Sequence, residues 1–190
     1  GIPEKKRWYI AYGSNLNLRQ MAMRCPTARL LGTGLVENYE LQFKGMPHGS
    51  FATIGPKKGA SVPVGVWEIT PRDEKALDVY EGYPRHYFKK NLTVAMEGQE
   101  VTAMAYIMNL QMNFGIPTQR YYNTVLEGYE QCGLDVAMLN RAVDASIERY
   151  RQALKEPFWN EEDYELMARF DGDIAEPQPE EDMFPGQLHL

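Results

Sequence analysis

The run Tyr9-Ile10-Ala11-Tyr12-Gly13-Ser14-Asn15-Leu16 gives the first structural signal in this sequence. The apolar and aromatic run from Arg7 to Tyr12 predicts a short buried strand, which ends at the Gly-Ser-Asn turn signal. Asn17 can cap a helix over residues 18–24, and Pro26 ends that helix. The beginning of the chain is therefore predicted to be a strand, a glycine turn and a helix in immediate succession.

The glycine turn is itself a candidate binding site. A glycine after a buried strand, just before a helix start, lets successive backbone N–H groups converge on one point, which suits an anion or a polarised carbonyl oxygen. Ser14 and Asn15 could add side-chain donors to the same point. On spacing alone, a glycine turn with an Asx cap is the more common meaning of this pattern. A nucleotide-phosphate loop is not supported, because the Gly-x-x-x-x-Gly-Lys pattern is missing from this turn.

Beyond the first helix, a β pattern gives way to a helical one. Apolar runs punctuated by glycines and prolines predict strands at 30–36, 39–44, 51–54 and 62–69. A helix follows, because Thr70 and Asp73 make a capping-box-like pair, Pro71 is at the first helical position and Gly82 can end the helix.

The second half of the chain predicts a hairpin and then helices. Its strands are 87–96 and 100–108, with Glu97-Gly98-Gln99 as the turn. Thr118 can cap a helix that runs to Gln131, and Asp135 can cap another with apolar residues at helical spacing. The predicted fold class is α+β: a small mixed, largely antiparallel β-barrel flanked by helices, over residues 7–154.

Residues 155–190 are assigned to an acidic C-terminal tail. The tail holds eleven acidic and two basic residues, whereas the rest of the chain holds 15 acidic and 18 basic ones. One short helix is predicted near 161–168, followed by a mobile end rich in proline and glutamate.

Composition excludes several classes of function. The 190 residues carry a net charge of −6, and no concentrated basic stripe suggests nucleic-acid binding. No apolar run approaches the ~18–20 residues that cross a bilayer, and no signal peptide opens the sequence. Cys25 and Cys132 cannot form a disulfide framework, and no Cys/His cluster has zinc-like spacing. We expect a cytoplasmic protein that needs no metal and no membrane; its oligomeric state is left open.

Glu81 is the candidate for general acid–base catalysis. If Gly82 ends the helix, the Glu81 carboxylate lies at the negative end of the helix dipole, and Tyr80 and Tyr83 would add desolvation. Both effects raise the pKa of a carboxyl group towards the range where a general acid–base works best. Taken alone, a solvated glutamate on a last helical turn is the more common alternative.

Weaker candidates lie elsewhere in the chain. Cys25 could be a thiol nucleophile paired with His48 or His86, although a buried small apolar residue is the better interpretation. The run Arg85-His86-Tyr87 could meet an anionic substrate or form an exposed turn. The pair Tyr121-Tyr122 opens a helix and could pack in the core or donate hydroxyls at a pocket rim.

The stretch from Tyr9 to Leu16 resembles the opening motif of the γ-glutamylcyclotransferases and their AIG2-like relatives. Four later segments recur in the order of that family: Gly65-Val66-Trp67-Glu68-Ile69, Leu77-Asp78-Val79-Tyr80-Glu81-Gly82, Ala103-Met104-Ala105-Tyr106-Ile107-Met108 and Pro117-Thr118-Gln119-Arg120-Tyr121. Each is weak alone, and in this order they are fairly specific. They cover about residues 8–133, and the tail after Lys155 is not matched.

The resemblance implies a mixed α/β barrel that releases 5-oxoproline from a γ-glutamyl amine or peptide. Its cavity would lie between the Tyr-Gly-Ser-Asn loop and the Glu-Gly helix end, with Glu81 as the catalytic acid/base. The implied substrate-binding residues are Tyr9, Ile10, Ala11, Tyr12, Gly13, Ser14, Asn15, Leu16 and Tyr121. Tyr121 is the least secure of them, because the alignment could slip by one residue to Tyr122.

Such an enzyme needs no cofactor, because a γ-glutamyl amide carries its own nucleophile, the α-amine. The protein must fold the substrate, stabilise the developing oxyanion and move protons. Two alternatives remain open: a non-catalytic AIG2-like protein that binds a small molecule or a partner, and a Cys25-dependent acyltransferase acting on a different amide. The identity of the leaving amine is also left open.

Overall fold

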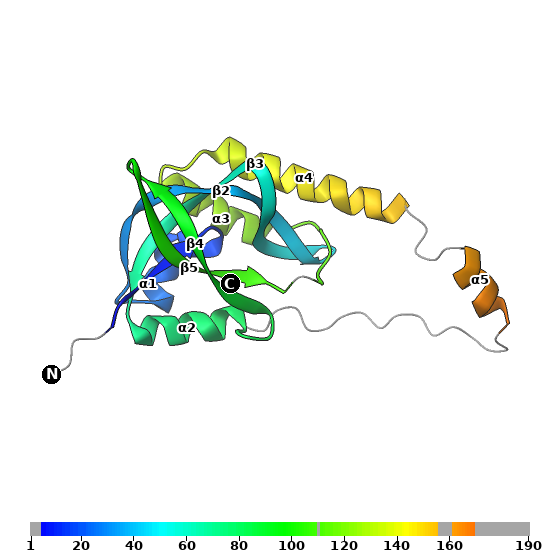
Figure 1. Cartoon of the computed structure of the whole chain (residues 1–190), viewed down its shortest axis with the longest axis horizontal. Coiled ribbons are helices and arrows are strands. Elements are labelled where there is room, and N and C mark those ends of the chain that lie inside the picture. The colour runs from blue at the N-terminus through cyan, green and yellow to red at the C-terminus, as the bar shows by residue number, and fades with distance from the viewer. Residues whose placement is uncertain (1–4, 110, 156–160, 170–190) are drawn as a thin grey trace.

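The computed structural model describes residues 5–109, 111–155 and 161–169 (Figure 1). A closed barrel lies at its centre, with the strand order β1-β3-β2-β4-β5. The strands are β1 (Arg7–Ala11), β2 (Arg29–Met46), β3 (Gly49–Ile69), β4 (Tyr87–Met96) and β5 (Gln99–Met108). The pairs are antiparallel, except that β1 and β5 are parallel where Tyr9 faces Met104. The predicted mixed, largely antiparallel barrel is confirmed.

Two long strands, β2 and β3, replace the four short ones predicted between residues 30 and 69. They pair with each other on both sides of two register shifts, one between Leu30 and Gly32 and one between Glu37 and Tyr39. At the second shift Asn38 has a φ of 62°, and its Oδ1 accepts a hydrogen bond from Gly59 N at 3.0 Å. The break predicted from glycines and prolines is therefore a bulge, in which Asn38 on β2 stands against residues 57–60 on β3 and the pairing resumes beyond it.

The helices that pack around the barrel are α1 (Leu18–Arg24), α2 (Pro71–Glu81), α3 (Gln119–Gln131) and α4 (Val136–Lys155). Figure 1 shows α2 on one side of the barrel and α3 and α4 on the other, with α4 extending past the barrel edge. A further helix, α5 (Glu161–Ala168), occurs where a short one was predicted. The predicted mobile end, residues 170–190, lies outside the described residues. Within the described ranges, no helix combines the length and the apolar character needed to cross a membrane.

The predicted helix caps are present. The Asn17 side chain accepts from the first turn of α1, Thr118 accepts from Tyr121 N in α3, and Asp135 accepts from Ala137 N in α4. At the start of α2, Thr70 and Asp73 each accept from the backbone of the other, which completes a capping box. The sequence therefore predicts the local chemistry that begins the four helices packed around the barrel.

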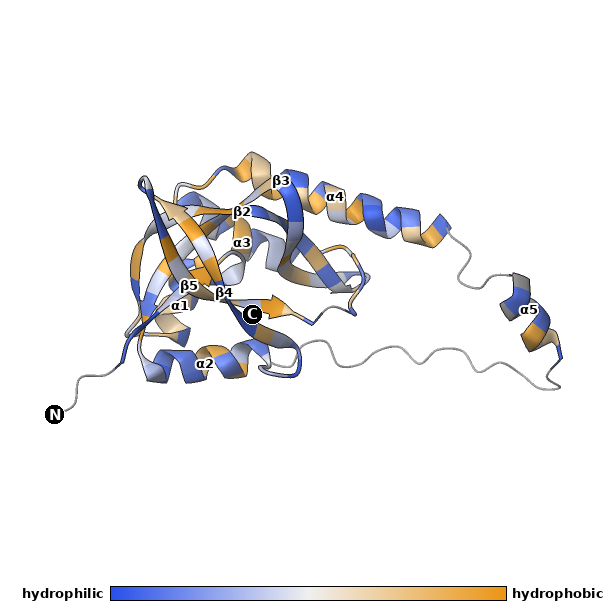
Figure 2. Cartoon of the chain, in the orientation of Figure 1, coloured by the Kyte–Doolittle hydropathy of each residue, from blue (hydrophilic) through white to orange (hydrophobic). Residues whose placement is uncertain are grey.

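The hydrophobic core fills the barrel and the space beneath the helices. Figure 2 shows apolar residues on the barrel strands, and polar residues interspersed with apolar ones along α2 and α4. The barrel contributes a set of fully buried valines: Val62, Val64, Val66 and Val94. The β-branched side chains suit this position, because they pack well on a pleated surface.

Helix α3 touches the segment after β1 at Gly128. A Cβ atom on this residue would lie 2.7 Å from Asn17 N and 2.8 Å from Leu16 Cβ, so the two backbones must separate to admit it. Without that contact, Gly128→Ala would stabilise the helix by about 1 kcal/mol through helix propensity. We instead expect a loss of about 1–3 kcal/mol from overpacking.

Chemical denaturation of Gly128→Ala gives the sign of this effect directly. Glu130→Ala is the matched control, since Glu130 lies on the exposed face of the same helix. A stabilised Gly128→Ala protein would show that α3 does not press on the segment after β1.

Candidate active site

The end of β1 and the end of α2 meet at a small polar cavity. Its walls come from the segment after β1, from α2, from the N-terminal turn of α3 and from four of the barrel strands, β1, β3, β4 and β5. The lining residues are Tyr9, Tyr12, Gly13, Ser14, Asn15, Ala52, Glu81, Tyr87, Tyr106 and Tyr121. Tyrosine hydroxyls and one carboxylate therefore dominate the chemistry of this cavity.

The segment after β1 forms one wall as a single 3₁₀ turn, η1 (Ser14–Leu16). Its first backbone bond runs from Leu16 N to Gly13 O at 3.0 Å, so the amides of Ser14 and Asn15 precede the hydrogen-bonded turn. Gly13 permits close approach of the walls, because a Cβ there would lie 3.1 Å from Ala52 Cβ and 3.2 Å from the Tyr121 hydroxyl oxygen.

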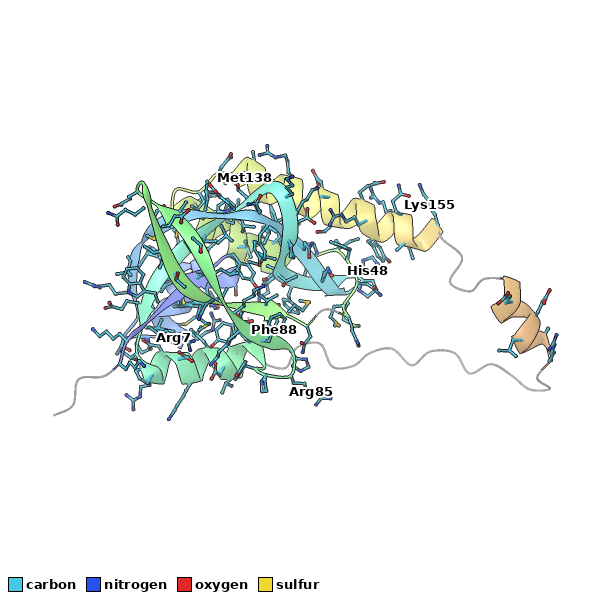
Figure 3. All side chains as sticks on the ribbon, viewed as in Figure 1. Arg7, His48, Arg85, Phe88, Met138 and Lys155 are labelled. Atoms are coloured by element: carbon cyan, nitrogen blue, oxygen red, sulfur yellow. The ribbon has the colours of Figure 1, made fainter. Side chains whose placement is uncertain are left out.

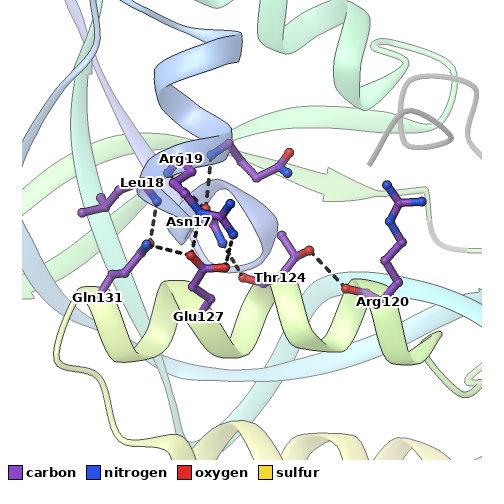
Figure 4. A network of polar contacts seen from close by, with 8 residues as sticks. Asn17, Leu18, Arg19, Arg120, Thr124, Glu127 and Gln131 are labelled. Carbon is purple, nitrogen blue, oxygen red and sulfur yellow. Dashed lines mark hydrogen bonds and ion pairs between the residues drawn. The ribbon is translucent and has the colours of Figure 1, made fainter.

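Helix α3 holds this segment in place from outside (Figure 4). Asn17 caps α1 with its Oδ1 and donates from its Nδ2 to the backbone oxygen of Thr124 at 3.0 Å. Arg19 donates to both carboxylate oxygens of Glu127, at 2.7 and 2.6 Å. One helix thus fixes the turn and also supplies Tyr121, its third residue, to the cavity wall.

Glu81 is the last residue of α2 and is buried, with only 8% of the residue exposed. Gly82 follows it in the left-handed conformation, with φ 63°. The termination is completed by hydrogen bonds from Gly82 N to Val79 O and from Tyr83 N to Asp78 O. The alternative of a solvated glutamate does not fit this burial.

Hydrogen bonds and ion pairs connect helix α2, which ends at Glu81, to strands β4 and β5. The Tyr106 hydroxyl donates to Asp78 Oδ1 at 2.5 Å. Lys89 Nζ lies 2.7 Å from Glu74 Oε2 and 2.9 Å from Asp78 Oδ1, with 17% of its side chain exposed. Three charges and one hydroxyl therefore fix the position of the helix that carries Glu81.

Two tyrosine hydroxyl groups at the cavity donate hydrogen bonds to backbone carbonyl oxygens. Tyr12 donates to the carbonyl oxygen of Tyr106, and Tyr87 donates to that of Ala52 at 3.0 Å. A phenol has one hydrogen to give, so neither group can at the same time donate to a ligand.

Two other hydroxyl groups accept hydrogen bonds from the protein. The Tyr9 oxygen accepts from Asn15 Nδ2 at 2.8 Å, and the Tyr121 oxygen accepts from Ala52 N at 3.1 Å. In these bonds the phenolic hydrogens are not used, which makes Tyr9 and Tyr121 the cavity's candidate donors.

Burial raises the pKa of Tyr9 and of Tyr12 well above the usual value, and the negative charge of Glu81 raises both further. Burial is also the largest cause of the raised pKa of Tyr80 and Tyr121, and the Glu81 charge acts on them in the same direction. The carboxylate is thus close to four phenols that stay protonated at neutral pH.

The structure brings most of the predicted binding residues to one place: Tyr9, Tyr12, Gly13, Ser14, Asn15, Glu81 and Tyr121 all line the cavity. Ile10, Ala11 and Leu16 instead lie in the hydrophobic core. Of the two adjacent tyrosines, Tyr121 faces the cavity, whereas the Tyr122 hydroxyl bonds to Asn140 on α4.

Three lining residues were not singled out as site residues from the sequence: Ala52, Tyr87 and Tyr106. Tyr106 lies inside one of the segments that resemble the family, and Tyr87 lies in the run considered for anion binding. What places them is barrel closure, which sets the Tyr9 and Tyr106 rings edge to face with centroids 5.8 Å apart.

Cys25, His48 and Arg85 are not among the residues that line this cavity. Burial is the main cause that raises the pKa of Cys25 to about 12, and its thiol lies 3.6 Å from Asp73 O. His48 is at the β2–β3 turn, across the barrel from α1, where it packs on the Tyr150 ring of α4 (Figures 1 and 3). Arg85 is exposed in the loop after α2 (Figure 3). In the described part of the chain, no three His, Cys, Asp or Glu side chains are grouped to hold a metal ion.

Comparison with known proteins gives one family. The model of the family described as "Gamma-glutamyl cyclotransferase, AIG2-like" matches residues 9–124. The γ-glutamylcyclotransferase of Homo sapiens is 29% identical over 143 residues, which are 70% of this chain and 76% of that protein. The γ-glutamylcyclotransferase of Bos taurus is 30% identical over 136 residues, 66% of this chain and 71% of that protein.

Solved structures show the same fold. A γ-glutamyl cyclotransferase superposes with a TM-score of 0.67 at 22% identity, covering 87% of this chain and 100% of that one. YkqA from Bacillus subtilis superposes with a TM-score of 0.64 at 21% identity, covering 74% of this chain and 55% of that one.

Proposed function

Since the chain belongs to the γ-glutamylcyclotransferase, AIG2-like family and is an enzyme of that kind, we propose that it converts a γ-glutamyl amine or peptide to 5-oxoproline and the free amine. The observation that carries the proposal is the buried carboxylate of Glu81, set among protonated tyrosines beside the Gly13–Asn15 segment. A proton-transfer group and several donors are thereby available around one small space.

In the proposed reaction the substrate supplies both the nucleophile and the electrophile. Glu81 takes a proton from the α-ammonium group, and the freed amine attacks the γ-carbonyl carbon to close a five-membered ring. The carbon–nitrogen bond to the leaving amine then breaks as Glu81 returns the proton to the departing nitrogen. The ring nitrogen loses its second proton to become the lactam N–H, and the released amine takes up one proton to become an ammonium ion. Holding the substrate folded removes the entropy cost of bringing the two groups together.

The developing oxyanion requires hydrogen-bond donors in the same cavity. The amides of Ser14 and Asn15, ahead of the turn, and the hydroxyl hydrogens of Tyr9 and Tyr121 are suited to this task. Such preorganised donors stabilise charge strongly because they do not reorient during the reaction.

The leaving amine is the undecided part of the substrate. A mass-spectrometric screen for 5-oxoproline over γ-glutamyl amino acids, γ-glutamyl dipeptides and γ-glutamyl polyamines would identify it. We expect at least one class to be consumed with equimolar release of 5-oxoproline and amine. Binding of these compounds without turnover would instead support a non-catalytic binding protein.

Thiol alkylation should leave the activity unchanged, because the proposed chemistry uses no cysteine. With its pKa raised to about 12, Cys25 is almost entirely the unreactive thiol at pH 7. Iodoacetamide treatment, followed by intact-mass measurement and an assay of 5-oxoproline release, checks this. Loss of activity that substrate protects against, with label on Cys25, would support the acyltransferase alternative.

A further inference from the structure

Arg24, the last residue of α1, lies directly behind the cavity wall. Its Nη1 donates to Asn15 Oδ1, and its Nη2 donates to Gln20 Oε1 at 3.0 Å. The guanidinium plane stacks on the Tyr80 ring, with Cζ 3.4 Å from the ring centroid. The side chain therefore contacts both the segment after β1 and the end of α2.

The bond from Arg24 fixes which way the Asn15 amide faces. A guanidinium group can only donate hydrogen bonds, so the atom of Asn15 that meets it must be the oxygen. The amide nitrogen is then forced to the other side, where it donates to the Tyr9 hydroxyl oxygen at 2.8 Å. With the opposite amide orientation, two donors would face each other at Arg24.

The orientation of the Asn15 amide determines whether the Tyr9 hydroxyl accepts or donates in the bond between them. Because its oxygen accepts from Asn15, its one hydrogen is left for another acceptor, and Tyr9 lines the cavity together with Glu81. If the amide were reversed, Tyr9 would donate to the Asn15 oxygen and offer the cavity only lone pairs. An oxyanion needs a donor, so the two directions have opposite consequences for the reaction.

A second contact supports the same geometry. The Tyr80 hydroxyl is 2.8 Å from Ser14 Oγ, and Arg24 covers the face of the Tyr80 ring. Arg24 thus joins the turn at Ser14 and Asn15 to the helix end that carries Glu81.

We infer that Arg24 is a positioning residue, which orients Asn15 so that Tyr9 presents its hydroxyl hydrogen to the γ-carbonyl oxygen of the substrate. The inference rests on the proposed function, because it names a group that acts in the same reaction. Arg24 itself touches neither the substrate nor Glu81 in this account; it acts through Asn15.

Two substitutions at Arg24 distinguish a role in orienting the Asn15 amide from a role in packing alone. Arg24→Lys keeps a group that can only donate, so it should retain kcat within a few-fold. Arg24→Met keeps a long stem without a donor, so the amide can reverse, and kcat should fall about 10²-fold with little change in KM, as when one oxyanion donor is removed. Arg141→Met is the matched control, since it makes the same chemical change at an exposed residue of α4.

Asn15→Asp tests the direction of the hydrogen bond between residue 15 and Tyr9 while Arg24 stays unchanged. The new carboxylate can accept from Arg24 but cannot donate to Tyr9, so the phenolic hydrogen turns towards it and away from the cavity. Asn15→Asp should lose kcat to the extent that Tyr9→Phe does, and the double variant should lose little more. Thermal unfolding of each variant checks that the fold persists.

The outcomes distinguish this inference from the proposed function. Wild-type protein that releases no 5-oxoproline from any γ-glutamyl compound would overturn the proposed function and the inference with it. Active wild-type protein with fully active Arg24→Met or Asn15→Asp variants would overturn the inference alone. So would an Arg24→Lys protein as impaired as Arg24→Met, since that result assigns Arg24 to packing.

Discussion

Glu81→Gln is expected to lower kcat for 5-oxoproline release by about 10²–10⁴-fold, the contribution of a general acid–base group, or by more because this group serves two proton transfers. The amide is nearly isosteric with the carboxyl group, so it fills the same buried position beside Tyr9 and Tyr12. It cannot take a proton from the α-ammonium group or return one to the leaving amine. Steady-state kinetics with the preferred γ-glutamyl compound, together with thermal unfolding, measures the effect.

Glu130→Gln is the control for this experiment, since it makes the same chemical change on the exposed face of α3. It should turn over at the wild-type rate. Near-wild-type cyclisation by a folded Glu81→Gln protein would remove Glu81 from the mechanism, and the reaction would then need another proton-transfer group.

Tyr121→Phe is expected to affect both the rate and the stability. Its hydroxyl oxygen accepts from the buried Ala52 N at 3.1 Å, and loss of that acceptor should cost about 1–3 kcal/mol in the free energy of unfolding. Its hydrogen is one of the proposed oxyanion donors, so kcat should fall about 10²–10³-fold. Kinetics and chemical denaturation measure the two effects separately.

The neighbouring tyrosine provides a matched control. Tyr122→Phe also removes one phenolic hydroxyl from the first turn of α3, but that hydroxyl contacts Asn140 on the outside of the molecule. It should have little effect on the rate. Equal losses of kcat in the two variants would mean that the Tyr121 hydroxyl does not act as an oxyanion donor.

The sequence predicts best those features that local chemistry determines. Thr70, Pro71 and Asp73 identify the start of α2, and Gly82 identifies its end, because each satisfies backbone groups within one turn. The position of Glu81 at a helix terminus follows from Gly82 alone. Its burial does not, because that depends on the tyrosines that β1, β4 and β5 bring around it.

The sequence does not predict features that arise from pairing over long distances. The bulge at Asn38 joins segments that read as separate strands, and its partner Gly59 is 21 residues away. Ala52 and Tyr106 reach the cavity only because the closed barrel sets β3 and β5 beside β1. Arg24 reads as an ordinary last-turn arginine, since its stacking on Tyr80 requires α1 and α2 to be side by side.

Transfer of a nitrogen label distinguishes intramolecular cyclisation from hydrolysis by water. A γ-glutamyl compound with ¹⁵N at the α-amine would be incubated with the wild-type protein in H₂¹⁸O, and the products would be analysed by mass spectrometry. Attack by the α-amine should give 5-oxoproline that carries the ¹⁵N and no ¹⁸O, with an equimolar amount of unlabelled amine, and Glu81→Gln should give no such product on the same time scale. Labelled glutamate containing ¹⁸O would show attack by water instead and would rule out the proposed cyclisation.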